Sequence, residues 1–157
     1  MNYHEKMFWV FFSIIVVLVI LLDICFSIWR NHRRHETFIQ AKQRSKQTKK
    51  KLLVIGDPNS GFWNKHIKKA YGCGDVCIDL MGCNECPKSI KSDLLVKLKK
   101  MPTNEYVIYE SCVLEYVDQR LVNEIKKEID RVSEGDYYEV RIKPNIFPTK
   151  FSFVELG

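Results

Sequence analysis

The segment from Met7 to Trp29 is almost entirely apolar, and it constrains the chain more than any other feature of the sequence. As an α-helix at about 1.5 Å per residue it would be roughly 35 Å long, enough to cross a hydrocarbon core of about 30 Å. A single span in lipid satisfies its backbone polar groups only as a helix. Its one charged residue, Asp23, lies close enough to the Trp29 end to reach the interface. The sequence therefore predicts a transmembrane helix over residues 7–29, after a short non-cytoplasmic tail at residues 1–6.

A cleaved signal peptide is the alternative interpretation of this segment. A signal peptide has a shorter apolar core and small residues before its cleavage site. Here the apolar stretch ends in the bulky run Phe26-Ser27-Ile28-Trp29. These residues favour a retained anchor.

Residues 30–51 form a strongly basic segment directly after the span, with nine lysines and arginines against one acidic residue, Glu36. Because basic residues next to a span stay on the cytoplasmic side, we expect a single-pass protein with its N-terminus outside and its C-terminal domain in the cytosol. We interpret the segment as a polybasic juxtamembrane stalk that binds anionic lipid head groups through residues Arg30 to Lys51. Nucleic acid is not an expected partner, because the stalk has one aromatic residue, Phe38, and no interleaved stacking pattern.

Residues 52–157 have nearly balanced charge, so the formal net charge of +6 comes from the stalk. Their number suits one small domain with a core. The pattern predicts strands at 51–55, 75–80, 105–109, 137–142 and 151–156 and helices at 62–71 and 118–133. The stretch Lys88 to Met101 fits either one helix or a short strand at 89–92 that leads into a helix.

Strands that alternate with helices predict an α/β fold, with a small, doubly wound and mostly parallel sheet. In such sheets ligands bind beyond the carboxyl ends of the strands, near the point where the strand order reverses. We therefore expect the functional residues directly after each strand.

The later half of this domain resembles the class I S-adenosylmethionine-dependent methyltransferases, which have a Rossmann-like fold. The resemblance covers roughly Leu52 to Pro144 and includes Leu114-Glu115-Tyr116-Val117, where the family has a Leu-Glu-His-Val-like segment. The stretches that carry it are Ile90-Lys91-Ser92-Asp93-Leu94, Met101-Pro102, EYVIYESCVLEYVD at 105–118, EIDRVSEG at 128–135 and YYEVRIKP at 137–144. The resemblance implies a methyltransferase-like domain with the cofactor S-adenosyl-L-methionine and a methyl acceptor that the sequence does not name.

Carried over by position, the resemblance implies a set of cofactor-binding residues. The loop after the first strand would hold the methionine part, Asp79 the ribose hydroxyls and Asp93 the adenine amino group. Carboxylates suit these places because the hydroxyls and the amine donate hydrogen bonds. The full set is Gly56, Asp57, Asn59, Gly61, Asp79, Asp93, Glu110 and Ser111. The last two would lie beside the reaction centre, and no catalytic residue is implied.

Two positions depart from the family pattern. Val54 stands where the family has an acid in the first strand, and Pro58, which has no N–H group, replaces a glycine. We expect a membrane-anchored methyltransferase-like protein, and the alternative is a catalytically inactive binding or scaffold protein of the same fold. Without a ligand, Asp57 would only shape a turn, Asp79 would cap the next loop and Asp93 would be an exposed helical residue.

Six cysteines occur in the chain: Cys25, Cys73, Cys77, Cys83, Cys86 and Cys112. The spacing of Cys83 and Cys86 is that of a zinc-ligand pair or a redox pair. Cys77, however, alternates with Val76 and Ile78 inside a predicted strand, which indicates a packed thiol. We expect reduced cysteines and no metal. A zinc-stabilised interaction module and a redox-active Cys83/Cys86 pair are the alternatives.

Overall fold

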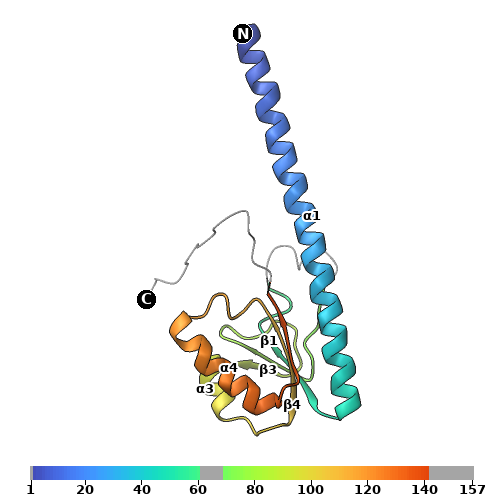
Figure 1. Ribbon diagram of the computed structural model, residues 1–157, viewed down its shortest axis with the longest axis vertical. Helices are drawn as coiled ribbons and strands as arrows, with labels where there is room; N and C mark the ends of the chain where they lie inside the picture. The colour runs from blue at the N-terminus through green and yellow to red at the C-terminus, as the bar shows by residue number, and fades with distance from the viewer. Residues whose placement is uncertain (1, 61–68, 142–157) are drawn as a thin grey trace.

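The computed structural model describes residues 2–60 and 69–141, and it contains a five-stranded sheet beside one long helix (Figure 1). Helix α1 runs from Tyr3 to Thr48. The strands are β1 (Lys51–Ile55), β2 (Val76–Asp79), β3 (Ser89–Lys91), β4 (Tyr106–Ser111) and β5 (Tyr137–Val140), and the other helices are α3 (Leu94–Lys99) and α4 (Gln119–Ser133). The predicted strand at 151–156 and most of the predicted helix at 62–71 lie outside the described residues.

The sheet has the strand order β3-β2-β1-β4-β5, and each neighbouring pair is parallel. This confirms the predicted α/β fold with a parallel sheet. The ambiguous stretch Lys88 to Met101 is a short strand followed by a helix, because Asp93 caps α3 by accepting a hydrogen bond from the Val96 amide. The strand order reverses at β1, which pairs with β2 on one side and β4 on the other, and the crevice at this reversal is where open parallel sheets bind ligands.

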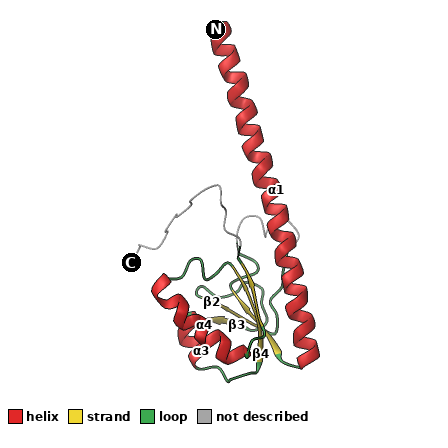
Figure 2. Cartoon of the chain, in the orientation of Figure 1, coloured by secondary structure: helices red, strands yellow, loops and turns green. Residues whose placement is uncertain are grey.

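Helices cover both faces of the sheet, as Figure 2 shows. In β1 the side chains of Leu53 and Ile55 join the core on the side of α3 and α4, whereas Leu52 and Val54 join the core on the side of α1. The apolar stripe of α4, with Ile125 and Ile129, packs on the first of these faces. A strand buried on both faces needs apolar residues at consecutive positions, which is why β1 is a continuous apolar run.

The segment predicted as a stalk is helical, and its second half belongs to the folded domain. Ala41 is fully buried, and the ring of Phe38 packs against the rings of Tyr71 and Tyr109. The Ser45 hydroxyl donates a hydrogen bond to the Lys50 carbonyl over 2.7 Å. Small and aromatic residues at spacings of three to four therefore give α1 a face that fits closely against the sheet.

Two basic residues of this segment are paired inside the protein. Arg44 Nε lies 2.6 Å from Asp136 Oδ1, and Lys50 Nζ lies 2.7 Å from Asp136 Oδ2. Burial acts to raise the pKa of Asp136, but the hydrogen bonds from Lys50 and Arg44 outweigh it and hold the pKa below its ordinary value. These two cations therefore anchor the C-terminal end of α1 to the loop before β5.

The strands run antiparallel to α1. Lys49 has a left-handed conformation with φ of 59° and reverses the chain directly before β1. Arg44 consequently lies near the start of β5, whereas the Arg34 carbonyl accepts a hydrogen bond from the Tyr109 hydroxyl near the end of β4, over 3.2 Å. All five carboxyl ends thus point toward the apolar N-terminal half of α1.

That N-terminal half extends beyond the sheet (Figure 1). Its large apolar side chains are exposed from Met7 to Ile24, and the first buried residue of the helix is Ser27. Among the described residues, α1 is the one helix that is long and apolar enough to cross a membrane. The predicted span and the domain therefore share a single helix and meet near Ser27.

Candidate functional site

A cavity of about 550 Å³ lies at the carboxyl edge of the sheet, within the size range of small-molecule sites. It spans the strand reversal at β1 and is closed on one side by α1 and on the other by α4. Its lining comes from the ends of four strands, the loops after them, and the helices α1, α3 and α4. The residues are Ile55 of β1 with Gly56, Asp57 and Ser60 after it, Ile78 and Asp79 of β2 with Leu80 after it, Ser92 and Asp93 after β3, Leu94 and Leu95 of α3, Ser111 of β4 with Cys112, Val113, Tyr116 and Val117 after it, Leu121 and Ile125 of α4, Tyr71, and Arg30 and Arg34 of α1.

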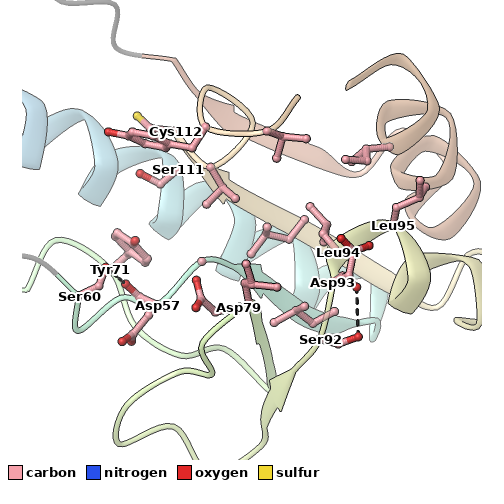
Figure 3. Close-up of a pocket in the computed structure, with 18 of the residues that line it drawn as sticks. Asp57, Ser60, Tyr71, Asp79, Ser92, Asp93, Leu94, Leu95, Ser111 and Cys112 are labelled. Atoms are coloured by element: carbon pink, nitrogen blue, oxygen red, sulfur yellow. Dashed lines mark hydrogen bonds between the residues drawn. The ribbon is translucent and has the colours of Figure 1, made fainter. Parts of the chain in front are cut away.

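Three of the predicted acids line this cavity, and two of them, Asp79 and Asp93, lie at the carboxyl ends of β2 and β3 (Figure 3). Asp79 is the last residue of β2, and its Oδ1 accepts a hydrogen bond from the Met81 amide over 2.8 Å. Its other oxygen has no hydrogen-bond partner in the described part of the chain. Asp93 follows β3, and its Oδ1 accepts from the Val96 amide over 3.0 Å. Both carboxylates cap local structure, and each keeps one oxygen for a donor on a ligand.

The loop after β1 reaches the cavity through Gly56 and Asp57. Gly56 has φ of +93°, and a Cβ atom there would lie 2.6 Å from Val113 Cγ2, so this position requires glycine. Asp57 is buried, with Oδ1 accepting from the Asn59 amide and Oδ2 accepting from Asn84 Nδ2. Both of its oxygens are therefore engaged within the protein. Asn59, also predicted in this loop, does not line the cavity, and the predicted Gly61 lies outside the described residues.

Glu110 and Ser111 end β4, and they have different surroundings. Glu110 does not line the cavity. Its Oε1 accepts hydrogen bonds from the Val113 and Leu114 amides, so it holds the loop after the strand. Burial raises the pKa of Glu110 to about 7. Ser111 does line the cavity, and its hydroxyl oxygen is buried without a hydrogen-bond partner among the described residues.

Sequence reasoning missed the residues that α1 contributes. Arg30 and Arg34 line the cavity beside Tyr71, and the Nε atom of each arginine is buried without a hydrogen-bond partner in the part of the chain that the structure describes. Burial, followed by the charge of Arg34, lowers the pKa of Arg30. Burial also raises the pKa of Tyr71, to about 12. The helical spacing of Ser27, Arg34 and Phe38 was the available signal, since these residues share a face of α1.

The cavity has different chemistry at its two ends. Asp93 follows the edge strand β3, and the arginines lie against β4, three strand spacings or roughly 14 Å away across the sheet. Asp79 and Gly56 lie between them. The site can therefore accept a ligand that donates hydrogen bonds at one end and carries an anionic group near the other.

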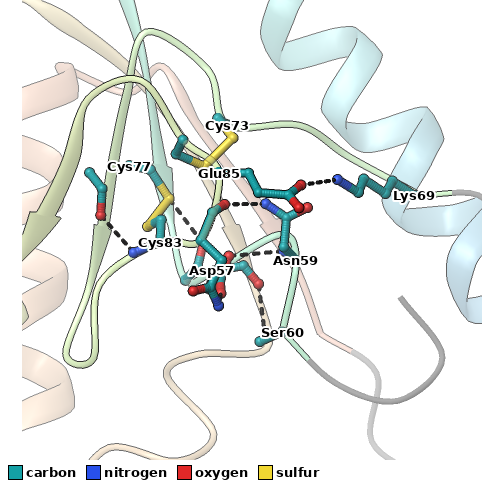
Figure 4. Close-up of a disulfide and its surroundings, with 12 residues drawn as sticks. Asp57, Asn59, Ser60, Lys69, Cys73, Cys77, Cys83 and Glu85 are labelled. Atoms are coloured by element: carbon teal, nitrogen blue, oxygen red, sulfur yellow. Dashed lines mark hydrogen bonds and ion pairs between the residues drawn. A yellow bond between two sulfur atoms is a disulfide. The ribbon is translucent and has the colours of Figure 1, made fainter. Parts of the chain in front are cut away.

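Four cysteines gather beside the loop after β1, and they are paired (Figure 4). The structure contains the disulfides Cys73–Cys86 and Cys77–Cys83, whereas Cys25 and Cys112 are free. The sequence-based prediction of reduced thiols is wrong for these four, because the turns between β1 and β3 bring together cysteines that are 13 and 6 residues apart. The sulfur atoms of Cys77, Cys83 and Cys86 lie within 4.8 Å of one another, a grouping that would suit a metal ion if the disulfides were reduced.

The disulfides bear on the predicted orientation. Disulfides persist in oxidising compartments and are rare in the cytosol. The pairing therefore removes the support that reduced cysteines gave to a cytosolic domain, and the basic residues after the span remain the basis of that prediction.

No family model, curated protein or solved structure matches this chain.

Proposed function

We propose that the chain is a membrane-anchored, methyltransferase-like protein that binds S-adenosyl-L-methionine in the cavity at the carboxyl edge of the sheet. The observation that carries the proposal is the position of Asp79, at the end of the strand next to β1, with one carboxylate oxygen available inside the cavity. A pair of vicinal ribose hydroxyls is the ligand group that such an oxygen suits.

The strand order supports this assignment. With Asp79 after β2 and Asp93 after β3, the two carboxylates follow neighbouring strands on one side of β1. A nucleoside on this side would place the rest of the cofactor near Gly56 and Val113, which both line the cavity. The cofactor would supply a methyl group on a sulfonium sulfur, and the residues after β4, with Ser111 and Tyr116, would form the acceptor side of the cavity.

A catalytically inactive binding protein is the second candidate, and three residues favour it. Val54, at the place of the family's acid, is fully buried on the α1 face of the sheet. Pro58 is also fully buried and offers no amide to a ligand. Asp57 has both oxygens engaged by its own loop. The loop after β1 therefore gives a cofactor fewer hydrogen-bonding groups than the ends of β2 and β3.

Calorimetric titration of the full chain in detergent micelles with S-adenosylmethionine and S-adenosylhomocysteine tests the proposal. The variant Asp79→Asn keeps an acceptor for the Met81 amide but replaces the second oxygen by a donor, so we expect cofactor affinity to fall about ten-fold or more. Glu115→Gln is the matched control, because Glu115 is exposed and does not line the cavity. Absence of binding at millimolar ligand would refute the proposal and favour the scaffold.

The orientation of the domain is part of the same proposal. The basic residues from Arg30 onward favour a cytosolic domain. The two disulfides favour the opposite side. Protease protection in sealed vesicles of known sidedness decides between the two orientations, because the protease digests the domain only if it lies on the outside of the vesicle.

A further inference from the structure

With the predicted span ending at Trp29, the charged end of the cavity would lie close to the lipid head groups. Arg30 and Arg34 follow the predicted end of the span, Trp29, by one and five residues, or roughly 2 and 8 Å along the helix axis. The head-group layer on each side of a bilayer is about 5–7 Å thick. Since the domain packs on α1 from Ser27 onward, its carboxyl edge would be held against the membrane surface.

The exposed apolar side chains of the domain also gather at this edge. Outside α1, the exposed large apolar residues of the described part are Leu80, Met81, Val96, Tyr116 and Leu121. All but Val96 follow β2 or β4 or begin α4, and Leu80, Tyr116 and Leu121 line the cavity itself. Tyr116 is 82% exposed and Met81 is 77% exposed. A tyrosine beside apolar residues is typical of a surface at the membrane interface.

The cavity has a specific place for an anion. Arg30 and Arg34 are one helical turn apart, they both line the cavity, and their buried Nε atoms have no hydrogen-bond partner within residues 2–60 and 69–141. A buried N–H donor without an acceptor is costly, and an anion in the cavity would supply the acceptor to both arginines. The fork of an arginine side chain matches a phosphate oxygen pair, and two of them can hold one phosphate from two sides.

We propose that the cavity opens at the bilayer surface and takes the phosphate head group of a membrane lipid, held by Arg30 and Arg34. The acyl chains would stay in the bilayer beside α1, and the apolar rim around Tyr116 would rest on the interface. The inference rests on the proposed function in one respect, since it names a phospholipid as the molecule brought next to the cofactor. The binding itself requires no cofactor.

This site differs from the diffuse attraction of a polybasic stalk. Arg44 and Lys50 are committed to Asp136 at the far end of the domain. Arg33, next to Arg34 in sequence, is exposed and does not line the cavity. Its Nη1 atom lies 4.0 Å from Glu36 Oε2. Arginines adjacent in the chain thus have different roles, which provides a matched control.

Native mass spectrometry of the full chain in detergent micelles tests the inference by titration with phosphatidic acid and, in parallel, with phosphatidylcholine. We expect Arg30→Gln/Arg34→Gln to weaken binding of phosphatidic acid ten-fold or more. The control Arg33→Gln/Lys42→Gln removes the same charge from exposed positions of the same helix, and we expect it to change binding less than two-fold. Near-UV circular dichroism of each variant confirms that the domain is folded.

Four results would overturn the inference. Equal losses in both double variants would show diffuse electrostatic attraction. Equal affinity for glycerol 3-phosphate would show a water-soluble phosphate ligand instead of a lipid. Absence of bound phosphatidic acid would remove the site. Finally, if Arg30→Gln/Arg34→Gln weakens S-adenosylmethionine and leaves phosphatidic acid unaffected, the arginines bind the cofactor carboxylate. The lipid titration contains no cofactor. Its result therefore tests the phosphate site even if S-adenosylmethionine does not bind.

Discussion

The substitution Asp136→Asn tests whether the basic half of α1 is a structural part of the domain. The Asp136 side chain is 9% exposed and accepts hydrogen bonds from Arg44 Nε at 2.6 Å and Lys50 Nζ at 2.7 Å. Asparagine has the same shape, but it is neutral and presents a donor to one of the two cations. The substitution therefore removes the charge of the pair while leaving the packing nearly unchanged.

The expected loss follows from the exposure of the partners. Removing one member of a fully buried pair costs about 3–5 kcal/mol, whereas exposed pairs contribute about 0–1 kcal/mol. Lys50 is largely buried, but the Arg44 side chain is 46% exposed and solvent screens its attraction. We therefore expect Asp136→Asn to lower the free energy of unfolding by roughly 2 kcal/mol, between these limits.

Urea unfolding of the full chain in detergent micelles, followed by near-UV circular dichroism of the buried tyrosines, measures this loss. The control is Asp130→Asn, because Asp130 is exposed on α4 and makes no ion pair in the described part. The pKa of Asp136 is lowered in the folded state. The stability that it adds is therefore present above its unfolded pKa of about 3.9 and is lost as the pH falls through the lower folded value. A change within about 0.5 kcal/mol of the wild type, or an equal change in Asp130→Asn, would refute this role.

Three further predictions follow from buried groups. Burial raises the pKa of Glu110 from 4.5 to about 7, so the free energy of unfolding should fall by about 3 kcal/mol as the pH rises from below 4.5 to above 7. In urea unfolding, Glu110→Gln should remove this pH dependence and Glu115→Gln should keep it. Equal pH dependence in the wild type and both variants would contradict the assignment. Gly74→Ala should lower the free energy of unfolding by at least about 2 kcal/mol more than Gly135→Ala. Both glycines have positive φ, but only a Cβ at Gly74 would lie 2.7 Å from the Leu52 carbonyl oxygen. Equal losses in the two variants would exclude this clash. In denaturant, maleimide should label Cys25 and Cys112 before reduction and all six cysteines after it. Reduction of Cys73–Cys86 should lower the free energy of unfolding by about 3 kcal/mol. Labelling of all six cysteines after chelation alone would instead indicate bound zinc.

The secondary structure of the domain was largely predictable. The apolar run Lys51–Ile55 is β1, and the amphipathic helix predicted at 118–133 is α4, which Asp118 caps by accepting from the Arg120 amide. These signals are local, since a strand buried on both faces must be continuously apolar and a helix on one face must be amphipathic. The parallel sheet followed from their alternation, and Asp79 and Asp93 lie at one edge because parallel strands end together.

The role of residues 30–48 was not predictable from charge. A run of basic residues usually forms a solvated segment, and the buried face of α1 consists of residues such as Ala41 and Ser45, whose small side chains give a weak hydrophobic signal. Their burial depends on a sheet formed by residues much later in the chain. The same limit applies to the cysteines, because Cys77 pairs with Cys83 only once the turns after β1 and β2 are in place.

The helices and strands of this protein were predictable from local patterns, because the length of an apolar run and the period of apolar residues act within one helix or strand. The sequence predicted a membrane-spanning helix, a parallel sheet and acidic residues at strand ends. That α1 extends past the predicted span and packs antiparallel to the strands is a property of the folded domain. That packing turns the carboxyl edge toward the apolar half of α1 and brings Arg30 and Arg34 into a cavity with Asp79. The physical reason is that this arrangement arises from contacts between residues far apart in the chain, such as Arg44 with Asp136 and Arg34 with Tyr109.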